Sequence, residues 1–348
     1  MTKPSARPLP LLAPLGAVWG SLTAARRRAY ERGWLPSYDL GVPTFSVGNL
    51  TLGGNGKTPM ALWLAGQIGG LGRGPAILSR GYGRTPDKRK REPLVVSAGD
   101  GPLVGAREAG DEPYCLAMRS GCPVVVARDR VLAGVRALEL GADALVLDDG
   151  FQHLALKRHL DVLMIRTPDD PSRQKVVPAG YLRENPRAQS KADVLVALGR
   201  EAPPWLVRMA AGRPLFLARL KPSCLLVPPD FGRVPLASLP PGPLAAFCGL
   251  GRPGAFWDTL DGLGLDVAAR LALPDHAAYG PASLRRLAEF RRASRAKSLL
   301  TTLKDAVKLP PDFSRDVLAL DVGLELDRPG EFLKIAAGVL AAGRKERP

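Results

Sequence analysis

The sequence predicts an α/β fold, in which a mainly parallel sheet covered by helices on both faces is followed by a second, smaller α/β domain. Two observations predict this fold. Between residues 43 and 198, short apolar runs alternate with longer helical stretches, which is the pattern of repeated βαβ units. A proline-rich segment at residues 201–205 then interrupts the alternation, and a new set of strand-like runs follows it.

The strand-like runs define the expected domains. In the first domain, residues 36–200, they read TFSV, AILS, PVVVA, ALVL, DVLMI and DVLVAL. In the second domain, residues 201–328, they read LFLARL, LAAFCGL, SLLTTL and VLALDVGLEL. Residues 1–35 are expected to form an N-terminal helix attached to the first domain, and residues 329–348 a C-terminal helix that returns to it.

Composition narrows the class of protein. The chain has 348 residues, of which 46% are hydrophobic and 24% charged, so packed soluble domains are expected. The net charge of +16 suits a polyanion, such as a phosphorylated substrate or an anionic membrane, but arginines spread over solvated faces would give the same value. The four cysteines form no C-x-x-C pair, which argues against a zinc site or a disulfide framework and favours a reducing cytoplasm.

The N-terminal segment has the pattern of an amphipathic helix. Its apolar stripe follows a 4-3-4 spacing and consists of Leu11, Leu15, Val18 and Leu22. Four arginines follow directly: Arg26, Arg27, Arg28 and Arg32. Such a helix either lies in the headgroup layer of an anionic membrane or packs its stripe on the protein's own core. No apolar run approaches the about 20 residues of a membrane-spanning helix, and the start lacks the features of a signal peptide, so we expect the protein to stay inside the cell.

The strongest local motif is a glycine loop between the strand TFSV and the helix-like run MALWLAGQI. It consists of Gly53, Gly54, Asn55, Gly56, Lys57 and Thr58. This context is that of the P-loop NTPases, in which backbone N–H groups and a helix N-terminus bind nucleotide phosphates. Lys57 would then reach the β- and γ-phosphates, and Thr58 would bind magnesium. Thr51 stands where the usual pattern has its first glycine, which predicts a longer or differently shaped loop; the plainer alternative is a glycine-rich turn with a surface lysine.

An acidic pair follows another expected strand. The run ALVL ends in Asp148 and Asp149, as expected where a carboxylate meets the magnesium ion of a P-loop site. Because the carboxyl ends of parallel strands meet at one edge of a sheet, the pair and the glycine loop would face the same nucleotide. Alone, an acidic pair after a strand is more often an ordinary turn, and the glycine loop is what favours the metal site.

Seven ordered motifs together resemble the tetraacyldisaccharide 4'-kinase family. The first three are SVGNLTLGGNGKTP, GDEP at residues 110–113 and DDGFQH at residues 148–153. The others are VPAGYLRE, AFCGLGRPGAF, PDHAAY and TTLKDAVKL. The resemblance extends from the N-terminal helix to about Leu309.

The resemblance implies a two-domain P-loop kinase at the cytoplasmic face of the bacterial inner membrane. It would use ATP and Mg²⁺ to phosphorylate the 4'-hydroxyl of an acylated glucosamine disaccharide phosphate, a lipid A precursor. The N-terminal helix would contact anionic membrane. No nucleic acid and no obligate protein partner is implied.

The resemblance also implies roles for individual residues. Asp111 matches a carboxylate that acts as the base, and His276 matches a histidine that assists it from the second domain. Lys57, Thr58 and the acidic pair match the phosphate and metal positions. Five further residues are expected to contact substrate or support the site: Glu112, Gln152, His153, Arg183 and Glu184.

Plainer roles remain open for several of these residues. Asp111 could cap a helix, His153 could be a structural histidine, and Arg183 and Glu184 could form an ordinary ion pair. Lys304 and Asp305 resemble a guanine-specificity pair, but they lie in the expected second domain, and we expect them to be structural. His159 is expected at the surface.

Two other functions compete with the kinase. A different P-loop enzyme, either a cytosolic NTPase or a small-molecule kinase, would turn over nucleotide independently of lipid. A nucleic-acid-binding protein regulated by ATP would need basic residues interleaved with aromatic ones, whereas only 6% of the residues are aromatic.

Overall fold

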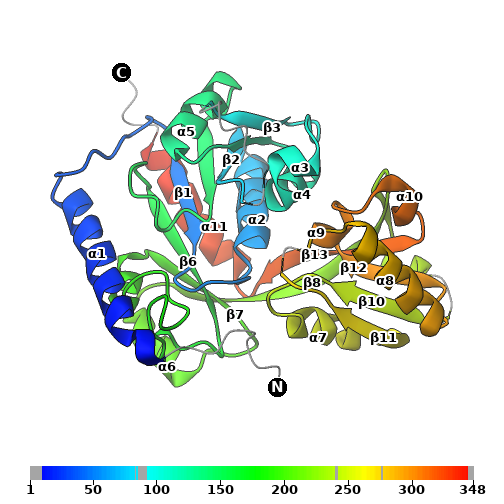
Figure 1. The fold of residues 1–348 in the computed structure, drawn as a ribbon. Coiled ribbons are helices and arrows are strands. Elements are labelled where there is room, and N and C mark those ends of the chain that lie inside the picture. Colours follow the sequence, from blue (N-terminus) through cyan, green and yellow to red (C-terminus); the bar gives the residue numbers. More distant parts are fainter. Residues whose placement is uncertain (1–9, 83, 85–91, 240–241, 276, 344–348) are drawn as a thin grey trace.

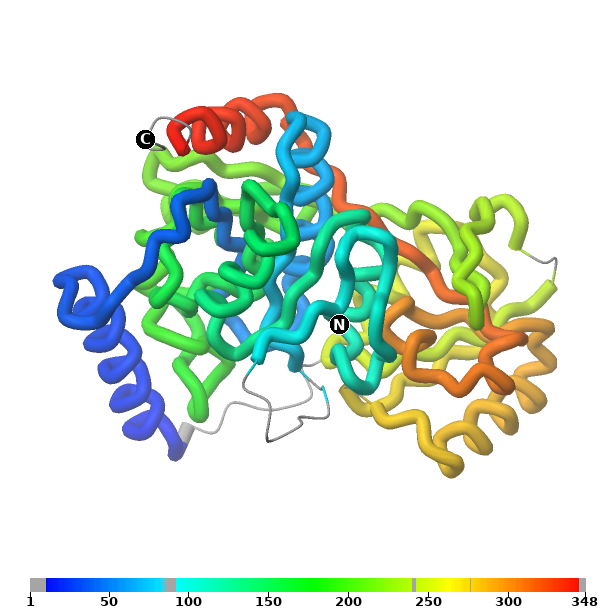
Figure 2. The backbone as a smooth tube through the Cα atoms, turned by 90° about the horizontal axis from the view of Figure 1, so that it is seen from above, coloured from blue at the N-terminus to red at the C-terminus, as the bar shows by residue number. Residues whose placement is uncertain are grey.

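The computed structural model describes residues 10–82, 84, 92–239, 242–275 and 277–343 (Figure 1). Within these residues, thirteen strands form one sheet in the order β11-β10-β12-β13-β8-β7-β6-β1-β5-β2-β4-β3, with β9 paired to β8 beside this path. The sheet therefore continues from the first part of the chain into the second without a break. Figure 2 shows the two parts side by side, with the helix α1 (Ala13–Glu31) at the end of the molecule farthest from the second part.

The first part of the sheet is parallel except at its β3 edge, where β3 pairs antiparallel with β4. Its strands are β1 (Thr44–Gly48), β2 (Pro75–Ser79), β3 (Leu94–Ala98), β4 (Pro123–Val126), β5 (Ala144–Asp148), β6 (Leu160–Arg166) and β7 (Val194–Leu198). β1 lies beside β5 with Val47 opposite Asp148. This register brings the loop after β1 next to the acidic pair after β5.

Two long strands join the parts. β8 (Leu215–Val227) begins parallel to β7 and continues antiparallel to β13 (Val317–Leu326), so both strands extend into the second part (Figure 1). The remaining strands are β9 (Gly232–Val234), β10 (Leu244–Cys248), β11 (Val267–Ala272) and β12 (Ser298–Thr302). β10 lies between β11 and β12, and all three run parallel.

Helices cover both faces of the first part. On one face, α2 (Lys57–Gly70), α4 (Asp111–Ser120) and α11 (Pro329–Ala342) share one apolar cluster with the strands. On the other face, α5 (Arg130–Glu139) packs in a second cluster and α6 (Pro204–Ala210) in a third. The burial of apolar side chains in these layers drives the assembly of the fold.

The second part has its own core. α7 (Gly254–Gly262) packs against one face of its strands and α8 (Pro281–Ala293) against the other. Short elements complete the chain: α3 (Ala106–Ala109), α9 (Leu303–Ala306) and α10 (Pro311–Ser314), and the 3-10 turns at Pro10–Leu12, Pro171–Arg173, Pro186–Lys191 and Leu236–Ser238.

The predicted fold class is confirmed, and every run expected to be a strand forms one. β3, β9 and β11 were not predicted. β11 lies at an edge of the sheet and alternates half-buried with exposed residues, which gives it no continuous apolar run. α6 follows the expected domain boundary at residue 200, yet it packs in a cluster with β6 and β7. α11 packs against α2, with the rings of Trp63 and Phe332 5.3 Å apart.

Candidate functional site

Two glycines, Gly48 and Gly56, stand at the ends of the segment between β1 and α2 that contains the glycine loop. Gly56 precedes α2 with a φ of 74°, in the left-handed region that favours glycine. Gly48 ends β1, where an added Cβ would lie 2.4 Å from the Cβ of Phe151. The loop between them ends at the N-terminus of α2, where backbone N–H groups attract anions.

Thr51, which replaces the usual first glycine, holds the loop through its side chain. The side-chain amide of Asn55 donates to the Thr51 hydroxyl at 2.5 Å. Thr51 also forms an antiparallel bridge with Leu182, and the backbone N–H of Leu52 donates to the carbonyl of Tyr181 at 2.8 Å. The loop is therefore tied to the segment that carries Arg183 and Glu184.

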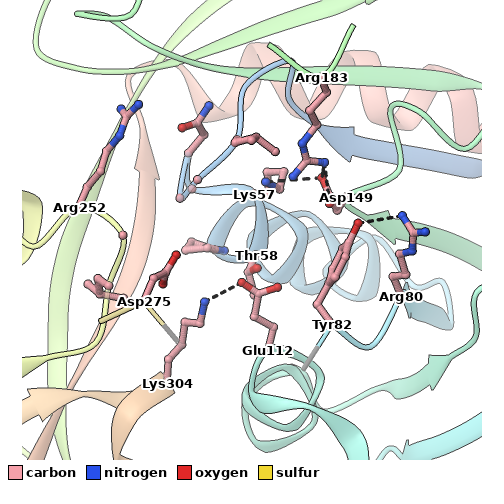
Figure 3. A pocket seen from close by; sticks show the side chains of 18 of the residues that line it. Lys57, Thr58, Arg80, Tyr82, Glu112, Asp149, Arg183, Arg252, Asp275 and Lys304 are labelled. Carbon is pink, nitrogen blue, oxygen red and sulfur yellow. Dashed lines mark hydrogen bonds and ion pairs between the residues drawn. The ribbon is translucent and has the colours of Figure 1, made fainter. Parts of the chain in front are cut away.

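Lys57 and Thr58 begin α2 and point toward the acidic pair (Figure 3). The Lys57 ammonium lies 3.2 Å from the Asn49 side-chain oxygen and 3.5 Å from Asp149 Oδ1. The Thr58 hydroxyl lies 3.4 Å from Asp148 Oδ2. The structure thus brings together the residues predicted to bind phosphate and metal.

The two aspartates differ in charge state. Burial raises the pKa of Asp148 to about 7, and the nearby charges of Glu112 and Asp149 add to this shift. Burial also acts on Asp149, but the charges of Lys57 and Arg183 outweigh it and hold the pKa of that carboxyl below its ordinary value. The negative charge of the pair is therefore concentrated on Asp149.

The pair fits a divalent cation. Asp148 Oδ1 is buried and has no hydrogen-bond partner among the described residues, so a ligand oxygen is left over. No group of three or more His, Cys, Asp or Glu side chains gathers for a metal in that part of the chain. Magnesium is usually bound by one or two carboxylates together with substrate phosphates and water, so the two aspartates are a ligand set of the kind that this ion uses.

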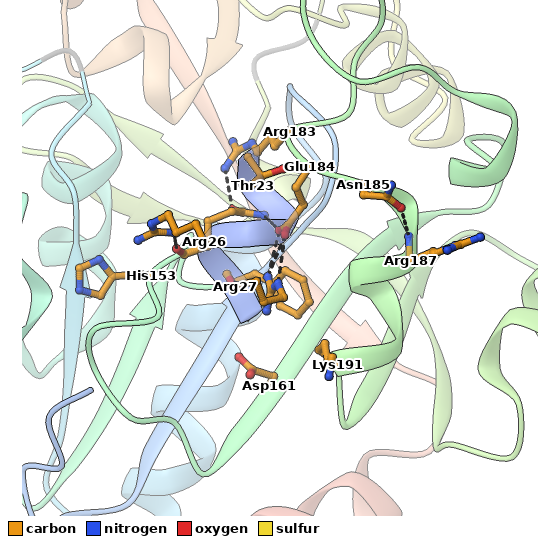
Figure 4. A network of polar contacts seen from close by, with 12 residues as sticks. Thr23, Arg26, Arg27, His153, Asp161, Arg183, Glu184, Asn185, Arg187 and Lys191 are labelled. Carbon is orange, nitrogen blue, oxygen red and sulfur yellow. Dashed lines mark hydrogen bonds and ion pairs between the residues drawn. The ribbon is translucent and has the colours of Figure 1, made fainter. Parts of the chain in front are cut away.

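Arg183 and Glu184 do not pair with each other. Arg183 Nη1 donates to both oxygens of Asp149, at 2.7 and 2.8 Å. Glu184 accepts from Arg27 of α1, and its Oε1 also accepts from the side-chain amide of Gln152 at 2.9 Å (Figure 4). These contacts connect the acidic pair to α1 through one polar network.

α1 packs on the protein through its glycine face. Gly16 and Gly20 lie against Val176, and an added Cβ on Gly16 would lie 2.7 Å from the Val176 carbonyl oxygen. The apolar stripe points elsewhere: Leu15, Val18 and Leu22 are each 58% exposed. The stripe therefore does not pack on the core of the protein. Arg27 departs from the expected cluster of lipid-facing arginines, because it is buried.

Asp111 and Glu112 begin α4 and face lysines of the second part. Asp111 is buried, its Oδ1 accepts from the backbone N–H of Glu112, and its Oδ2 lies 3.7 Å from Lys308 Nζ. Lys304 Nζ donates to Glu112 Oε1 at 2.7 Å (Figure 3). Glu112 and Lys304 line the same cavity as the glycine loop, whereas Asp111 is not among the residues that line this cavity. The predicted partner of Asp111, His276, lies outside the described residues.

His153 lines the cavity and accepts a hydrogen bond. Its Nε2 accepts from the backbone N–H of Arg130 at 3.3 Å, at the start of α5. Burial lowers the pKa of His153 to about 4, and the charge of Arg130 acts in the same direction. His159, which was expected at the surface, is half-buried, and its Nδ1 accepts from the backbone N–H of Thr44.

A cavity of ≈ 1150 Å³ unites these elements. Its lining includes the glycine loop, Asp149 and α1 on one side and residues of α9 and β13 on the other. Nine arginines contribute to its wall: Arg26, Arg27, Arg80, Arg119, Arg128, Arg130, Arg166, Arg183 and Arg252. Such a surface suits a substrate that carries several phosphates.

Most of the wall arginines were not predicted. Arg80 directly follows β2, and Arg128 and Arg130 closely follow β4. The carboxyl ends of parallel strands are the usual position of ligand-binding residues, so this placement was the available signal. Lys304 and Asp305 were both expected to be structural; Lys304 lines the cavity, whereas Asp305 is fully buried.

The comparisons with known proteins agree with one another. A family model described as tetraacyldisaccharide-1-P 4'-kinase (LpxK) matches residues 9–340. The tetraacyldisaccharide 4'-kinase of Anaeromyxobacter dehalogenans is 40% identical, over 86% of this chain and 83% of its own length. That of Geobacter metallireducens is 39% identical, over 88% and 90%.

A solved structure is also similar. The Aquifex aeolicus LpxK, described as an "apo" form in complex with ATP, has a TM-score of 0.77 and 32% identity. The match covers 94% of this chain and 98% of that one. Since the family model spans almost the whole chain and the relatives agree with it, this chain belongs to the tetraacyldisaccharide-1-P 4'-kinase family.

Proposed function

We propose that this chain transfers the γ-phosphoryl group of ATP to the 4'-hydroxyl of a tetraacyldisaccharide 1-phosphate, at the cytoplasmic face of the bacterial inner membrane. The observation that carries the proposal is the shared cavity. It reaches from Lys57 and Thr58 of the glycine loop to Trp19, Thr23 and Arg26 of α1. A nucleotide on the loop and an acceptor beside α1 would therefore occupy one basic space.

The nucleotide is assigned to the loop from Gly53 to Thr58. Its backbone N–H groups and the Lys57 ammonium hold the phosphates, and Thr58 and the two aspartates hold Mg²⁺. The ion supplies positive charge that offsets the charge developing on the transferred group. Lys57, now 3.5 Å from Asp149, can move to phosphate without leaving that aspartate unpaired, because Arg183 still contacts it.

Asp111 is assigned as the base and His276 as its assistant. Asp111 takes the proton of the attacking hydroxyl, and His276 orients or shares it. Two facts support this assignment: Asp111 is at the N-terminus of α4, and the neighbouring Glu112 already lines the cavity. Because Asp111 itself is buried beside Lys308, the assignment requires α4 and the second part to shift when substrate binds.

The exposed stripe of α1 is assigned to the membrane. No helix in the described part of the chain is long and apolar enough to cross a bilayer. A stripe of leucine and valine beside arginines is instead suited to the headgroup layer. Because α1 also lines the cavity, a lipid in that layer would reach the site without leaving the membrane.

A transfer assay tests the activity. Labelled ATP is incubated with the protein and the acylated disaccharide phosphate in detergent, and the lipid is separated by thin-layer chromatography. We expect label on the lipid, and a rate at least about 100-fold lower for Lys57→Ala. Label released only as inorganic phosphate, at a rate independent of lipid, would contradict the proposal and favour a cytosolic NTPase.

The base assignment has its own test. We expect the double variant Asp111→Ala, His276→Ala to lose little more kcat than the worse single variant, because groups that act as a unit lose activity non-additively. Losses that multiply would show that the two residues act independently, and His276 would then be assigned to substrate binding.

A further inference from the structure

We propose that Lys304 is a catalytic residue supplied by the second part of the chain, whose ammonium group contacts the γ-phosphoryl group of bound ATP and offsets its charge during transfer. The inference rests on the proposed kinase function. It adds a cation that reaches the nucleotide from across the cavity, opposite the Lys57 of the glycine loop.

Lys304 stands on a rigid base. It lies in α9, where the Thr302 hydroxyl accepts from the backbone N–H of Asp305. The fully buried Asp305 carboxylate accepts from the backbone N–H of Gly249 at 3.0 Å and from the Tyr279 hydroxyl at 2.8 Å. The backbone around Lys304 is therefore fixed, while its own side chain extends into the cavity (Figure 3).

The present partner of Lys304 adjoins the metal position. Lys304 Nζ donates to Glu112 Oε1 at 2.7 Å. Glu112 and Lys304 line the same cavity as Thr58, whose hydroxyl lies 3.4 Å from Asp148 Oδ2 (Figure 3). The ammonium group therefore faces the space that the glycine loop and the proposed Mg²⁺ ligands also face, where the phosphates would lie.

The Lys304–Glu112 pair is not needed to join α4 to the second part. Arg119 of α4 already contacts Asp321 at 3.0 Å and donates to the Val322 carbonyl at 2.8 Å. The Lys304 and Glu112 side chains are 32% and 29% exposed, so solvent weakens the attraction between them. A structural role therefore explains the position of Lys304 less well than a catalytic one.

Nucleotide binding would favour the exchange of partners. Glu112 would be drawn toward a magnesium ion held near Asp148, and the γ-phosphate would offer Lys304 more negative charge than one carboxylate does. Other phosphoryl-transfer enzymes likewise receive a cation from a separate element, and that cation offsets charge in the transition state. Lys304 would serve this purpose only when the two parts of the chain enclose the nucleotide.

The test compares three substitutions with a matched control. Lys304→Met removes the charge, Lys304→Gln removes the charge but keeps a donor for Glu112, and Lys304→Arg keeps the charge. The control is Lys221→Met, because Lys221 forms an exposed pair with Glu325 between β8 and β13, and neither residue lines the cavity. Each full-length protein is assayed for kcat, for KM of ATP, and for its affinity for Mg·ADP with and without aluminium fluoride, a mimic of the transferring phosphoryl group.

We expect Lys304→Met and Lys304→Gln to lower kcat about 100-fold while KM for ATP changes less than about threefold. They should weaken binding of the ADP–aluminium fluoride complex by a similar factor and leave ADP affinity unchanged. Lys304→Arg should recover part of kcat, and Lys221→Met should match the wild type. This selective loss for the transition-state mimic is one that a purely structural role would not produce.

Two results would overturn the inference. One is a Lys304→Gln protein whose kcat stays within about threefold of wild type; the other is an equal loss of affinity for ADP with and without aluminium fluoride. Failure of the proposed function is distinguishable, because it would appear as no label transfer to lipid by the wild type itself. The nucleotide-binding comparison contains no lipid and still decides the role of Lys304 in that case.

Discussion

Arg27 and Glu184 form a buried ion pair, with Arg27 Nη2 2.9 Å from Glu184 Oε2 and side chains that are only 9% and 5% exposed. The pair joins α1 to the segment that carries Arg183. The Arg183 carbonyl also accepts from Trp19 Nε1 of α1 at 3.0 Å. α1 therefore lines the site on one face and exposes its apolar stripe on another.

Removing one partner of this pair should lower the free energy of unfolding. Arg27→Ala leaves the Glu184 carboxylate buried without its cation, and we expect a loss of about 3–5 kcal/mol in the free energy of unfolding. Denaturant unfolding measures it, with Arg28→Ala as the control, because Arg28 is the exposed neighbour on the same helix. Equal stability of the two variants would contradict the structural role of Arg27.

The exposed stripe of α1 should govern membrane binding and leave stability unchanged. Replacing Leu15 and Leu22 with serine removes apolar surface that contacts solvent, so the fold loses little. We expect flotation with anionic vesicles at low salt to fall at least about tenfold, because each leucine would otherwise be buried in the lipid boundary.

Leu103→Ser is the matched control for this experiment, because Leu103 is also exposed, at 63%, but lies in the loop between β3 and α3. Binding that falls equally in both proteins, or does not fall in either, would show that the stripe is not the membrane contact.

The sequence predicted the fold because the signals for it are local. A run such as ALVL is apolar enough to be a buried strand wherever it lies, and a glycine loop between a strand and a helix defines its own geometry. The parallel order of β1 and β5 then follows, and it places Lys57 beside Asp149. These parts of the site needed no knowledge of distant contacts.

Contacts between segments that are far apart in the sequence could not be predicted from local patterns. Lys304 and Glu112 are 192 residues apart, and nothing in either neighbourhood indicates the other. The orientation of α1 also stayed open, because the leucine stripe fits a core as well as a membrane. The close packing of Gly16 against the Val176 carbonyl fixes which face of α1 lies against the protein. This face could not be predicted, because a glycine gives no apolar signal in a sequence pattern.

Lys57 should be required for transfer but not for folding. Lys57→Ala removes a charge that compensates the phosphates, and we expect kcat to fall at least about 100-fold. Circular dichroism should be unchanged, because Arg183 still neutralises Asp149. Lys221→Ala, a change in an exposed pair, is the control. A Lys57→Ala protein that keeps more than about a tenth of wild-type kcat would contradict the phosphate-loop assignment.

His153 should make the folded state less stable in mild acid. Its pKa is about 4 in the folded protein, because burial and then the charge of Arg130 disfavour the protonated form. Its ordinary pKa is about 6.5 in an unfolded chain. Between these values the unfolded chain binds more protons than the folded one, so the free energy of unfolding falls as the pH is lowered from about 6.5 to about 4.

Replacing His153 with glutamine should remove this part of the pH dependence. The glutamine oxygen can accept from the Arg130 backbone N–H, as His153 Nε2 does, but it does not titrate in this range. We expect the loss of unfolding free energy between pH 7 and pH 4.5 to be about 1–2 kcal/mol smaller in His153→Gln than in the wild type. The difference is no larger because the ring is partly exposed, and solvent weakens the effect of the nearby charges. Denaturant unfolding at several pH values measures this difference. Parallel pH profiles for the two proteins would show that His153 takes up a proton as readily in the folded protein as in the unfolded chain. The assignment of a neutral imidazole that accepts a hydrogen bond at the start of α5 would then be wrong.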